Sequence, residues 1–121
     1  MKMQDKIVIN DYIENDPLSE ENLDKTLETV NRFRLSFPNK SIWIYSGYNF
    51  TDFFFTPIRK ASEIDSNTKR KQIISQCTVM VDGRYIDSQR DITLKWRGSS
   101  NQRVIDTQKS LKENKIVLYC D

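Results

Sequence analysis

Ser41-Ile42-Trp43-Ile44-Tyr45 is a run in which apolar residues stand at consecutive positions instead of alternating with polar ones. Such a run is typical of a strand that is covered on both faces of a parallel sheet. Upstream, Ser19 to Phe37 has the pattern of a helix, with Ser19 as its N-cap, acidic residues near its start and Pro38 at its end. Before this helix, residues 6–9 read Lys-Ile-Val-Ile, which predicts a short strand. The three segments together predict a β-α-β unit.

The same pattern continues towards the C-terminus. A polar loop is expected over Ser62–Asn67, followed by a short helix over Lys69–Gln76 and a buried strand over Cys77–Val81. Asp91–Thr107 is irregular, and Lys115–Cys120 predicts a last strand. We therefore expect an α/β fold built on a parallel sheet.

Length and charge restrict the class of protein. The 121 residues suffice for one hydrophobic core and are too few to expect a second, so residues 1–121 are predicted to form a single domain. Nineteen basic and seventeen acidic side chains give a net charge of +2, which predicts neither a nucleic-acid partner nor a membrane surface. The sequence has no long apolar run and no signal-peptide pattern at Met1, so a cytoplasmic protein is expected.

The cysteine and histidine counts exclude several kinds of site. The sequence has no histidine, which rules out Ser-His-Asp and Cys-His catalysis and histidine-ligated zinc. Its two cysteines, Cys77 and Cys120, lie far apart, whereas a four-iron cluster needs three or four thiolates. A cluster shared between two copies of the chain stays open. Buried structural thiols are the favoured interpretation of both cysteines.

The three glycines indicate where a ligand would bind. Gly47 and Gly83 each follow a predicted strand, and Gly98 lies in the irregular stretch. In parallel α/β sheets, ligands bind outside the carboxyl ends of the strands, where glycine allows tight turns and close approach of the backbone. The loop over Asn10–Pro17 leaves the first strand at that same edge. We therefore predict a site at this edge, although each glycine taken alone is equally explained as a turn residue.

Other polar and aromatic clusters have simpler interpretations. Arg97 and Arg103 enclose a string of small polar residues that suits a carboxylate or phosphate, or else an ordinary solvated loop. Asp16, Asp82 and Asp91 show no spacing of an acid-base pair and are expected in caps or turns. The phenylalanines of residues 50–55 are expected in the core, not on a base-stacking surface.

Four segments carry a resemblance to a known family. They are Asp16-Pro17-Leu18, residues 42–50 (Ile-Trp-Ile-Tyr-Ser-Gly-Tyr-Asn-Phe), residues 79–85 (Val-Met-Val-Asp-Gly-Arg-Tyr) and residues 94–103 (Leu-Lys-Trp-Arg-Gly-Ser-Ser-Asn-Gln-Arg). In order and spacing they resemble the anaerobic ribonucleoside-triphosphate reductase activating proteins. Those proteins are small radical S-adenosylmethionine (SAM) enzymes.

The resemblance implies a fold, cofactors and a partner. The fold would be a partial (β/α) barrel-like parallel sheet, a truncated radical SAM core, with SAM across the carboxyl ends of its strands. In the family, a four-iron cluster (4Fe-4S) held by a CxxxCxxC segment reduces SAM to a radical, which abstracts hydrogen from a glycine of the large subunit of anaerobic ribonucleoside-triphosphate reductase. The positions that match the family near SAM are Asp16, Pro17, Ser46, Gly47, Tyr48, Asp82 and Gly83. The C-terminal signature is matched by Arg97, Gly98, Ser99, Asn101, Gln102 and Arg103.

Two departures from the family affect the expected activity. The CxxxCxxC segment is absent from this sequence, and the family's Gly-Gly-Asp-Pro motif reads Glu14-Asn15-Asp16-Pro17. Side chains at Glu14 and Asn15 would crowd the ligand. No catalytic or metal-ligating residue is therefore assigned, the cluster is not expected in this chain, and the chain as written should not perform the reaction.

Three interpretations follow from these departures. The chain is the C-terminal part of a reductase activase, a non-catalytic homologue that binds the reductase, or an unrelated anion-binding α/β domain that uses Arg97 and Arg103. A partial barrel would leave strand edges uncovered, so self-association is also expected.

Overall fold

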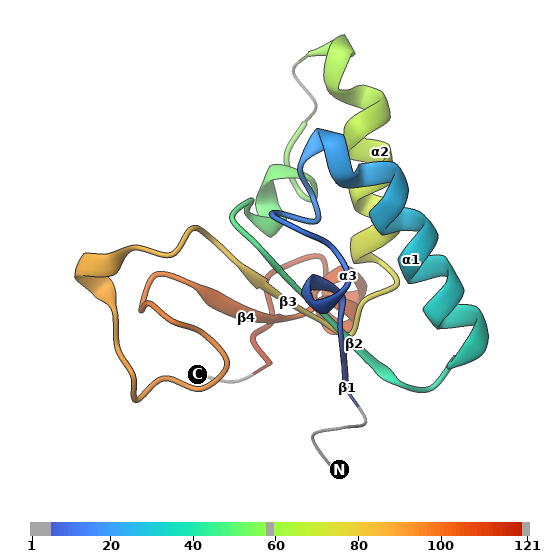
Figure 1. Ribbon diagram of the computed structural model, residues 1–121. Helices are drawn as coiled ribbons and strands as arrows, with labels where there is room; N and C mark the ends of the chain where they lie inside the picture. Colours follow the sequence, from blue (N-terminus) through green and yellow to red (C-terminus); the bar gives the residue numbers. More distant parts are fainter. Residues whose placement is uncertain (1–5, 58–59, 120–121) are drawn as a thin grey trace.

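The computed structural model describes residues 6–57 and 60–119, which form a sheet with helices on one face (Figure 1). Four strands lie in the order β1-β2-β3-β4. They are β1 (Lys6–Val8), β2 (Ser41–Ser46), β3 (Val79–Asp82) and β4 (Arg103–Asp106). The α-helices are α1 (Leu23–Ser36), α2 (Ile64–Ile74) and α3 (Thr107–Glu113).

The predicted β-α-β unit is confirmed. Strands β1 and β2 pair in parallel with Ile7 opposite Ile42, and helix α1 connects them. Strand β3 adds to β2 in parallel through α2, with Ile44 opposite Met80. The first three strands therefore have the expected direction and the expected connections.

The prediction of an all-parallel sheet is wrong at the fourth strand. Strand β4 pairs antiparallel to β3, within a stretch that was expected to be irregular. Beyond α3, the predicted strand over Lys115–Cys120 is reduced to an isolated bridge between Leu118 and Ile105, while Cys120 lies outside the described residues. The sheet is therefore mixed, and a barrel-like core is not confirmed.

The helices also differ from the prediction in their bounds. Helix α2 starts at Ile64, so most of the predicted loop over Ser62–Asn67 is helical. Ser19 precedes a 3-10 turn at Glu20–Asn22, but its hydroxyl donates to the carbonyl of Asp16 instead of capping the helix. Helix α3 was not predicted. Within the described ranges, no helix is both long and apolar enough to cross a membrane.

Each face of the sheet has its own layer of buried side chains. Ile42, Ile44 and Met80 point into the core shared with α1 and α2, together with Phe50 and Phe53 of the predicted core segment. The opposite face carries a second cluster formed by Trp43, Val79, Val81 and Val104. Trp96 covers this second face in place of a helix, with its ring 5.1 Å from that of Trp43. The loop between β3 and β4, which carries Trp96, is thus one layer of the fold.

Candidate functional site

Asp16 ties the loop after β1 to the end of β2. Its Oδ1 accepts hydrogen bonds from the Leu18 backbone N–H at 2.9 Å and from the Ser46 hydroxyl at 2.9 Å. Its Oδ2 accepts from the Gly47 N–H at 2.8 Å. The bond to Leu18 closes an Asx turn, which Pro17 supports by its fixed φ. One carboxylate therefore fixes the first predicted motif against the second.

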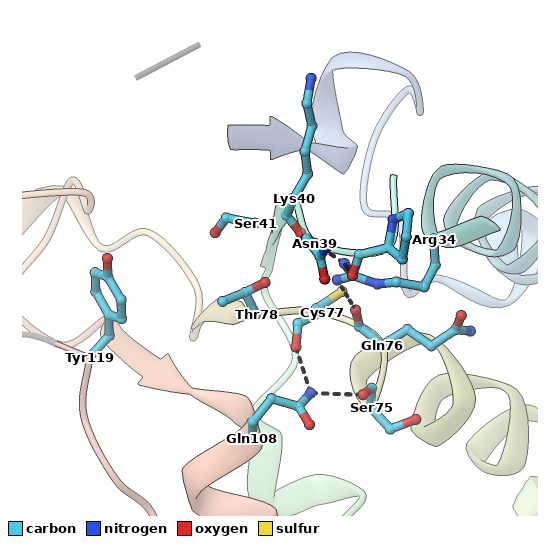
Figure 2. A pocket seen from close by; sticks show the side chains of 11 residues that line it. Arg34, Asn39, Lys40, Ser41, Ser75, Gln76, Cys77, Thr78, Gln108 and Tyr119 are labelled. Carbon is cyan, nitrogen blue, oxygen red and sulfur yellow. Dashed lines mark hydrogen bonds between the residues drawn. The ribbon is translucent and has the colours of Figure 1, made fainter. Parts of the chain in front are cut away.

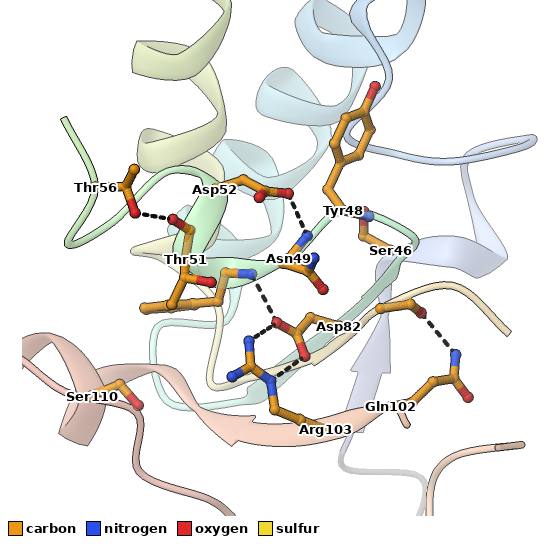
Figure 3. A network of polar contacts seen from close by, with 12 residues as sticks. Ser46, Tyr48, Asn49, Thr51, Asp52, Thr56, Asp82, Gln102, Arg103 and Ser110 are labelled. Atoms are coloured by element: carbon orange, nitrogen blue, oxygen red, sulfur yellow. Dashed lines mark hydrogen bonds and ion pairs between the residues drawn. The ribbon is translucent and has the colours of Figure 1, made fainter. Parts of the chain in front are cut away.

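Asp82, at the end of β3, likewise joins separate segments of the chain through its carboxylate (Figure 3). Its side chain is only 1% exposed and forms a bidentate ion pair with Arg103, in which Nε lies 3.0 Å from Oδ1 and Nη2 lies 2.6 Å from Oδ2. Arg103 stands directly opposite Asp82 in the antiparallel ladder, so the register of β4 produces the pair. The carboxylate also accepts from the Phe50 N–H at 2.8 Å, and it raises the already high pKa of Arg103.

Gln102 joins the remaining two glycine turns. Its amide nitrogen donates to the Gly83 carbonyl at 3.0 Å, as Figure 3 shows, and its amide oxygen accepts from the N–H groups of Gly98 and Ser99 at 3.0 and 3.1 Å. Gly83 has a φ of +98°, which disfavours any side chain there. A Cβ on Gly98 would lie 3.1 Å from the ring of Tyr85. The backbone conformation therefore favours glycine at position 83, whereas a side chain at position 98 would require a small shift of the Tyr85 ring.

The other side chains of the C-terminal signature fold the loop between β3 and β4. The buried Ser99 hydroxyl donates to Asn101 Oδ1 at 2.6 Å and accepts from the Ile86 N–H at 3.2 Å. Asn101 in turn donates to the Arg84 carbonyl at 2.8 Å. Arg103 is held by Asp82 and Arg97 is not, and joint binding of an anion by Arg97 and Arg103 stays a prediction.

These contacts surround a hollow of about 210 Å³ at the carboxyl ends of β2 and β3. Its lining residues are Asp16, Tyr45, Ser46, Gly47, Gly83, Tyr85 and Gln102. The predicted convergence of the glycine turns at one edge is therefore observed. Tyr45 and Tyr85 were not predicted as site residues, although both lie within the motif segments, next to Ser46 and two residues after Gly83.

Three predicted site residues do not line this hollow. Pro17 is buried beneath the loop, and Asp82 is occupied by Arg103. The side chain of Tyr48 points away from the Asp82 network in Figure 3 and packs against Phe53, with ring centroids 5.8 Å apart. These three residues stabilise the loops at the carboxyl ends of the strands.

The three aspartates expected in caps or turns have separate roles. Asp16 closes its Asx turn, and Asp91 accepts from the N–H and hydroxyl of Thr93 in a second turn. These hydrogen bonds lower the pKa of Asp91. Asp82 departs from the expectation because it forms an ion pair. None of the three pairs with another carboxylate to form an acid-base site.

The altered Gly-Gly-Asp-Pro motif keeps a backbone conformation that suits glycine. Asn15 has a φ of +64°, and asparagine tolerates this left-handed region better than most residues. Glu14 and Asn15 are exposed and line a separate hollow of about 710 Å³ on the loop after β1. Neither residue lines the 210 Å³ hollow, and the crowding of a ligand by these two side chains stays a prediction.

A larger hollow, of about 720 Å³, lies at the opposite edge of the sheet (Figure 2). The Arg34 guanidinium beside it donates to the carbonyls of Pro38, Lys40 and Gln76 at 3.1, 2.8 and 2.6 Å. This arginine is therefore occupied by backbone acceptors, while the ammonium of Lys40, which also lines the hollow, lies 4.6 Å from the centroid of the Phe37 ring. No sequence motif pointed to this edge.

Cys77 borders that same opposite edge and does not suit a metal cluster. Its side chain is buried, its Sγ donates to the Ile73 carbonyl at 3.4 Å, and burial raises the pKa of the thiol to about 12. Within residues 6–57 and 60–119, no group of three or more histidine, cysteine or acidic side chains is placed to hold a metal ion. A four-iron cluster therefore does not fit the described residues.

Comparisons with known proteins agree with the motifs. A family model described as a 4Fe-4S single cluster domain matches residues 14–105. A relative from Escherichia coli K12 named anaerobic ribonucleoside-triphosphate reductase-activating protein is 36% identical over 89 residues, covering 74% of this chain and 49% of the relative. Relatives of the same name from Vibrio cholerae and phage T4 are 33% and 30% identical, with 72% and 74% of this chain and 48% and 47% of the relatives covered.

The matches cover the segments on which the resemblance rests. The chain spans about half the length of the curated relatives it matches. No solved structure matches. The resemblance to the reductase-activating proteins is confirmed, and the chain belongs to the family of 4Fe-4S single cluster domains.

Proposed function

We propose that the chain acts in the activation of an anaerobic ribonucleoside-triphosphate reductase, as the part of a glycyl-radical-generating enzyme that borders bound SAM. The observation that carries the proposal is the arrangement of Asp16 and Gln102. Their hydrogen bonds gather the turns at Gly47, Gly83 and Gly98 around one hollow at the carboxyl ends of the parallel strands. This edge is where α/β sheets bind ligands.

The charge and the side-chain types of the lining suit the part of SAM that the hollow would hold. The Asp16 carboxylate supplies negative charge for the sulfonium and ammonium groups of the ligand. The half-exposed ring of Tyr85 offers an apolar face to the adenine. Gly47 and Gly83 let the ligand approach the backbone closely. Bound SAM would supply the radical, while these residues would bind and orient it.

The cluster is a separate requirement, which the described residues do not meet. Cys77 is buried at the opposite edge of the sheet, and the sequence holds one further cysteine, Cys120. The thiolates of the cluster would therefore have to come from outside the described residues. We propose that this chain by itself does not carry out the radical reaction.

A non-catalytic role as a reductase-binding module is the second candidate function. It is favoured by the internal bonding of the signature residues, because Asp82 with Arg103 and Gln102 with Gly83 keep the edge folded without a cofactor. On this alternative the chain binds the large subunit of the reductase and does not bind SAM. Self-association of the chain stays a prediction.

Calorimetric titration of the purified chain with SAM tests the proposal. We expect the wild type to bind SAM and Tyr85→Ala to bind at least about tenfold more weakly, since an aromatic contact is lost. Tyr12→Ala is the matched control, because Tyr12 is 53% exposed against 50% for Tyr85 and lies outside the hollow. Absence of SAM binding by the wild type would refute the SAM site and favour the binding module.

Anaerobic reconstitution with iron and sulfide tests the statement about the cluster. We expect the chain to retain much less than one cluster per molecule after desalting, because it lacks three thiolates. Stoichiometric iron on this chain alone would refute the proposal that it does not hold the cluster.

A further inference from the structure

The loop between β3 and β4 is a fixed projection from the sheet. In Figure 1 it extends away from the helices as the orange part of the chain. An antiparallel bridge between Arg90 and Ser99 closes it, and the Ser100 N–H donates to the Gln89 carbonyl at 2.8 Å. The Ser99 and Asn101 side chains bond its base, as described above. Its side chains are therefore presented in a defined arrangement.

Arg97 differs from the other shielded arginines of the structure. Among the described residues, four arginines are buried or half-buried, namely Arg34, Arg70, Arg97 and Arg103. Arg34 and Arg70 donate to backbone carbonyls, and Arg103 pairs with Asp82. The Nε of Arg97 is buried without a hydrogen-bond partner, and its guanidinium forms no ion pair within residues 6–57 and 60–119.

A buried N–H donor without an acceptor is costly, so the Nε of Arg97 requires an explanation. A carboxylate that binds a guanidinium through two parallel hydrogen bonds would satisfy this donor. The charge of Arg97 helps to lower the pKa of Asp91, but these two side chains, both within the described residues 60–119, form no ion pair. The geometry therefore points to an acceptor on another molecule.

The backbone beside Arg97 is strained. Trp96 has a φ of +69°, a conformation that is unusual for a bulky residue. Its ring is held against Trp43, and the Lys6 ammonium lies 4.1 Å from both ring centroids. Strain of this kind persists where the surrounding structure enforces it, and it is frequent at functional sites. The packing of Trp96 thus fixes the position from which Arg97 projects.

The loop that carries Arg97 combines exposed apolar side chains with positive charge. Ile92 is 85% exposed and Ile86 is 38% exposed on the same loop. Residues 84–98 contain four basic and two acidic side chains, a net charge of +2 that equals the net charge of the whole chain. Exposed apolar side chains together with arginine are typical of protein interfaces, and the positive charge favours an acidic partner surface.

We propose that the loop of residues 84–97, apart from Tyr85 in the SAM hollow, forms the surface that docks the reductase, with Arg97 binding a carboxylate of the reductase. This inference rests on the proposed function and names the surface that serves it. Arg97 is not among the residues that line the 210 Å³ hollow, so its carboxylate belongs to the docked protein and not to SAM. Docking here would bring the partner to the edge of the sheet where SAM is proposed to bind.

The test measures binding of the full chain to the anaerobic ribonucleoside-triphosphate reductase encoded by the same genome, by anaerobic biolayer interferometry. We expect Arg97→Gln to weaken binding at least about tenfold at low salt, and Arg97→Lys to recover only part of the affinity because an ammonium lacks the planar fork. Arg32→Gln is the matched control, since Arg32 is exposed on α1 and pairs only with Glu28. SAM titration and thermal unfolding of each variant complete the test.

The outcomes separate this inference from the proposed function. Arg97→Gln should unfold at or above the wild-type temperature, because the substitution breaks no hydrogen bond of the described chain. Wild-type affinity of this folded variant for the reductase would overturn the docking inference and leave the proposed function intact. A loss of SAM binding with unchanged reductase binding would also overturn it. Failure of the wild type to bind the reductase would refute the proposed function itself.

Discussion

Replacing Arg103 by methionine should destabilise the fold through the carboxylate that the substitution leaves behind. Asp82 is 1% exposed and would keep only the Phe50 N–H as a donor. Breaking one side of a buried ion pair costs about 3–5 kcal/mol. The Arg103 side chain is 36% exposed, so water can partly replace its guanidinium, and we take a lower value of about 2–3 kcal/mol.

A double-mutant cycle isolates the contribution of the pair. Asp82→Asn keeps an oxygen for the Phe50 N–H and should cost about 1–2 kcal/mol, since Arg103 can then be hydrated. The double variant should be more stable than the two single effects predict, with a coupling of at least about 1 kcal/mol. Urea unfolding followed by the fluorescence of Trp43 and Trp96 measures these energies. Arg32→Met is the control and should change stability by less than about 0.5 kcal/mol, because its pair with Glu28 is exposed.

The pH dependence of the same variant has a defined sign. Asp82 raises the pKa of Arg103 above an ordinary value that is already very high, so the arginine stays charged in both the folded and the unfolded chain below that value. Stability contributed by its charge is therefore fully present at neutral pH and is lost only in strong alkali. The contribution of Arg103 to the stability difference should thus be constant from about pH 6 to pH 9. Additive single effects in the cycle would refute the reasoning.

Three further predictions concern separate residues. Asp16→Ala should lower the unfolding free energy by about 2–4 kcal/mol, and Asp16→Asn by less, because alanine removes the acceptor of the hydrogen bonds from Leu18, Ser46 and Gly47; a loss below about 0.5 kcal/mol for alanine in urea unfolding would contradict this. Asn15→Gly should be nearly neutral while Asn15→Val costs about 1–2 kcal/mol at a φ of +64°, and equal stabilities would show that the loop adapts. In a Cys120→Ser background, iodoacetamide should label Cys77 only after unfolding. Burial raises the pKa of Cys77 to about 12, so the thiol of the unfolded chain ionises at a lower pH than the thiol of the folded chain. The unfolding free energy should therefore fall above about pH 9, by up to ~1.4 kcal/mol per pH unit. If a Cys77→Ala variant shows the same slope, the loss belongs to other groups.

The parallel part of the sheet was predictable because β2 and β3 each contain a run of consecutive apolar residues. Residues 42–45 and 79–81 are apolar at consecutive positions, and both strands are buried along most of their length. The parallel pairing of these strands places Ser46 beside Asp82 at the sheet edge. Local pattern and tertiary packing agree in these segments, so the sequence was sufficient.

Strand β4 and helix α2 were mispredicted for two different reasons. In β4, only Val104 and Ile105 are fully buried, and the flanking Arg103 and Asp106 resemble loop residues until their partners are known. In α2, the polar stretch at residues 65–68 is helical although its buried apolar residues, Ile73 and Ile74, lie at the far end, and the other buried residues, Asn67 and Arg70, are polar. Tertiary contacts determine the secondary structure of both β4 and α2, and the local sequence of each segment does not indicate these contacts.

The C-terminal signature shows why a motif of polar residues is hard to interpret from sequence. Its arginines and amides suggested a ligand-binding cluster, yet Ser99, Asn101, Gln102 and Arg103 direct their side chains into the protein itself. These residue types are therefore largely explained by the turn that they form, in which the Gln102 side-chain amide bonds both Gly83 and Gly98.

Arg97 is the exception within this string, as a comparison with Arg103 shows. Two arginines six residues apart are equivalent in composition, but the ladder places Arg103 opposite a buried carboxylate and leaves Arg97 on the projecting loop. A buried Nε–H without an acceptor lowers the stability of the folded chain. Its presence is accounted for when the molecule that completes its hydrogen bonds is the docked partner.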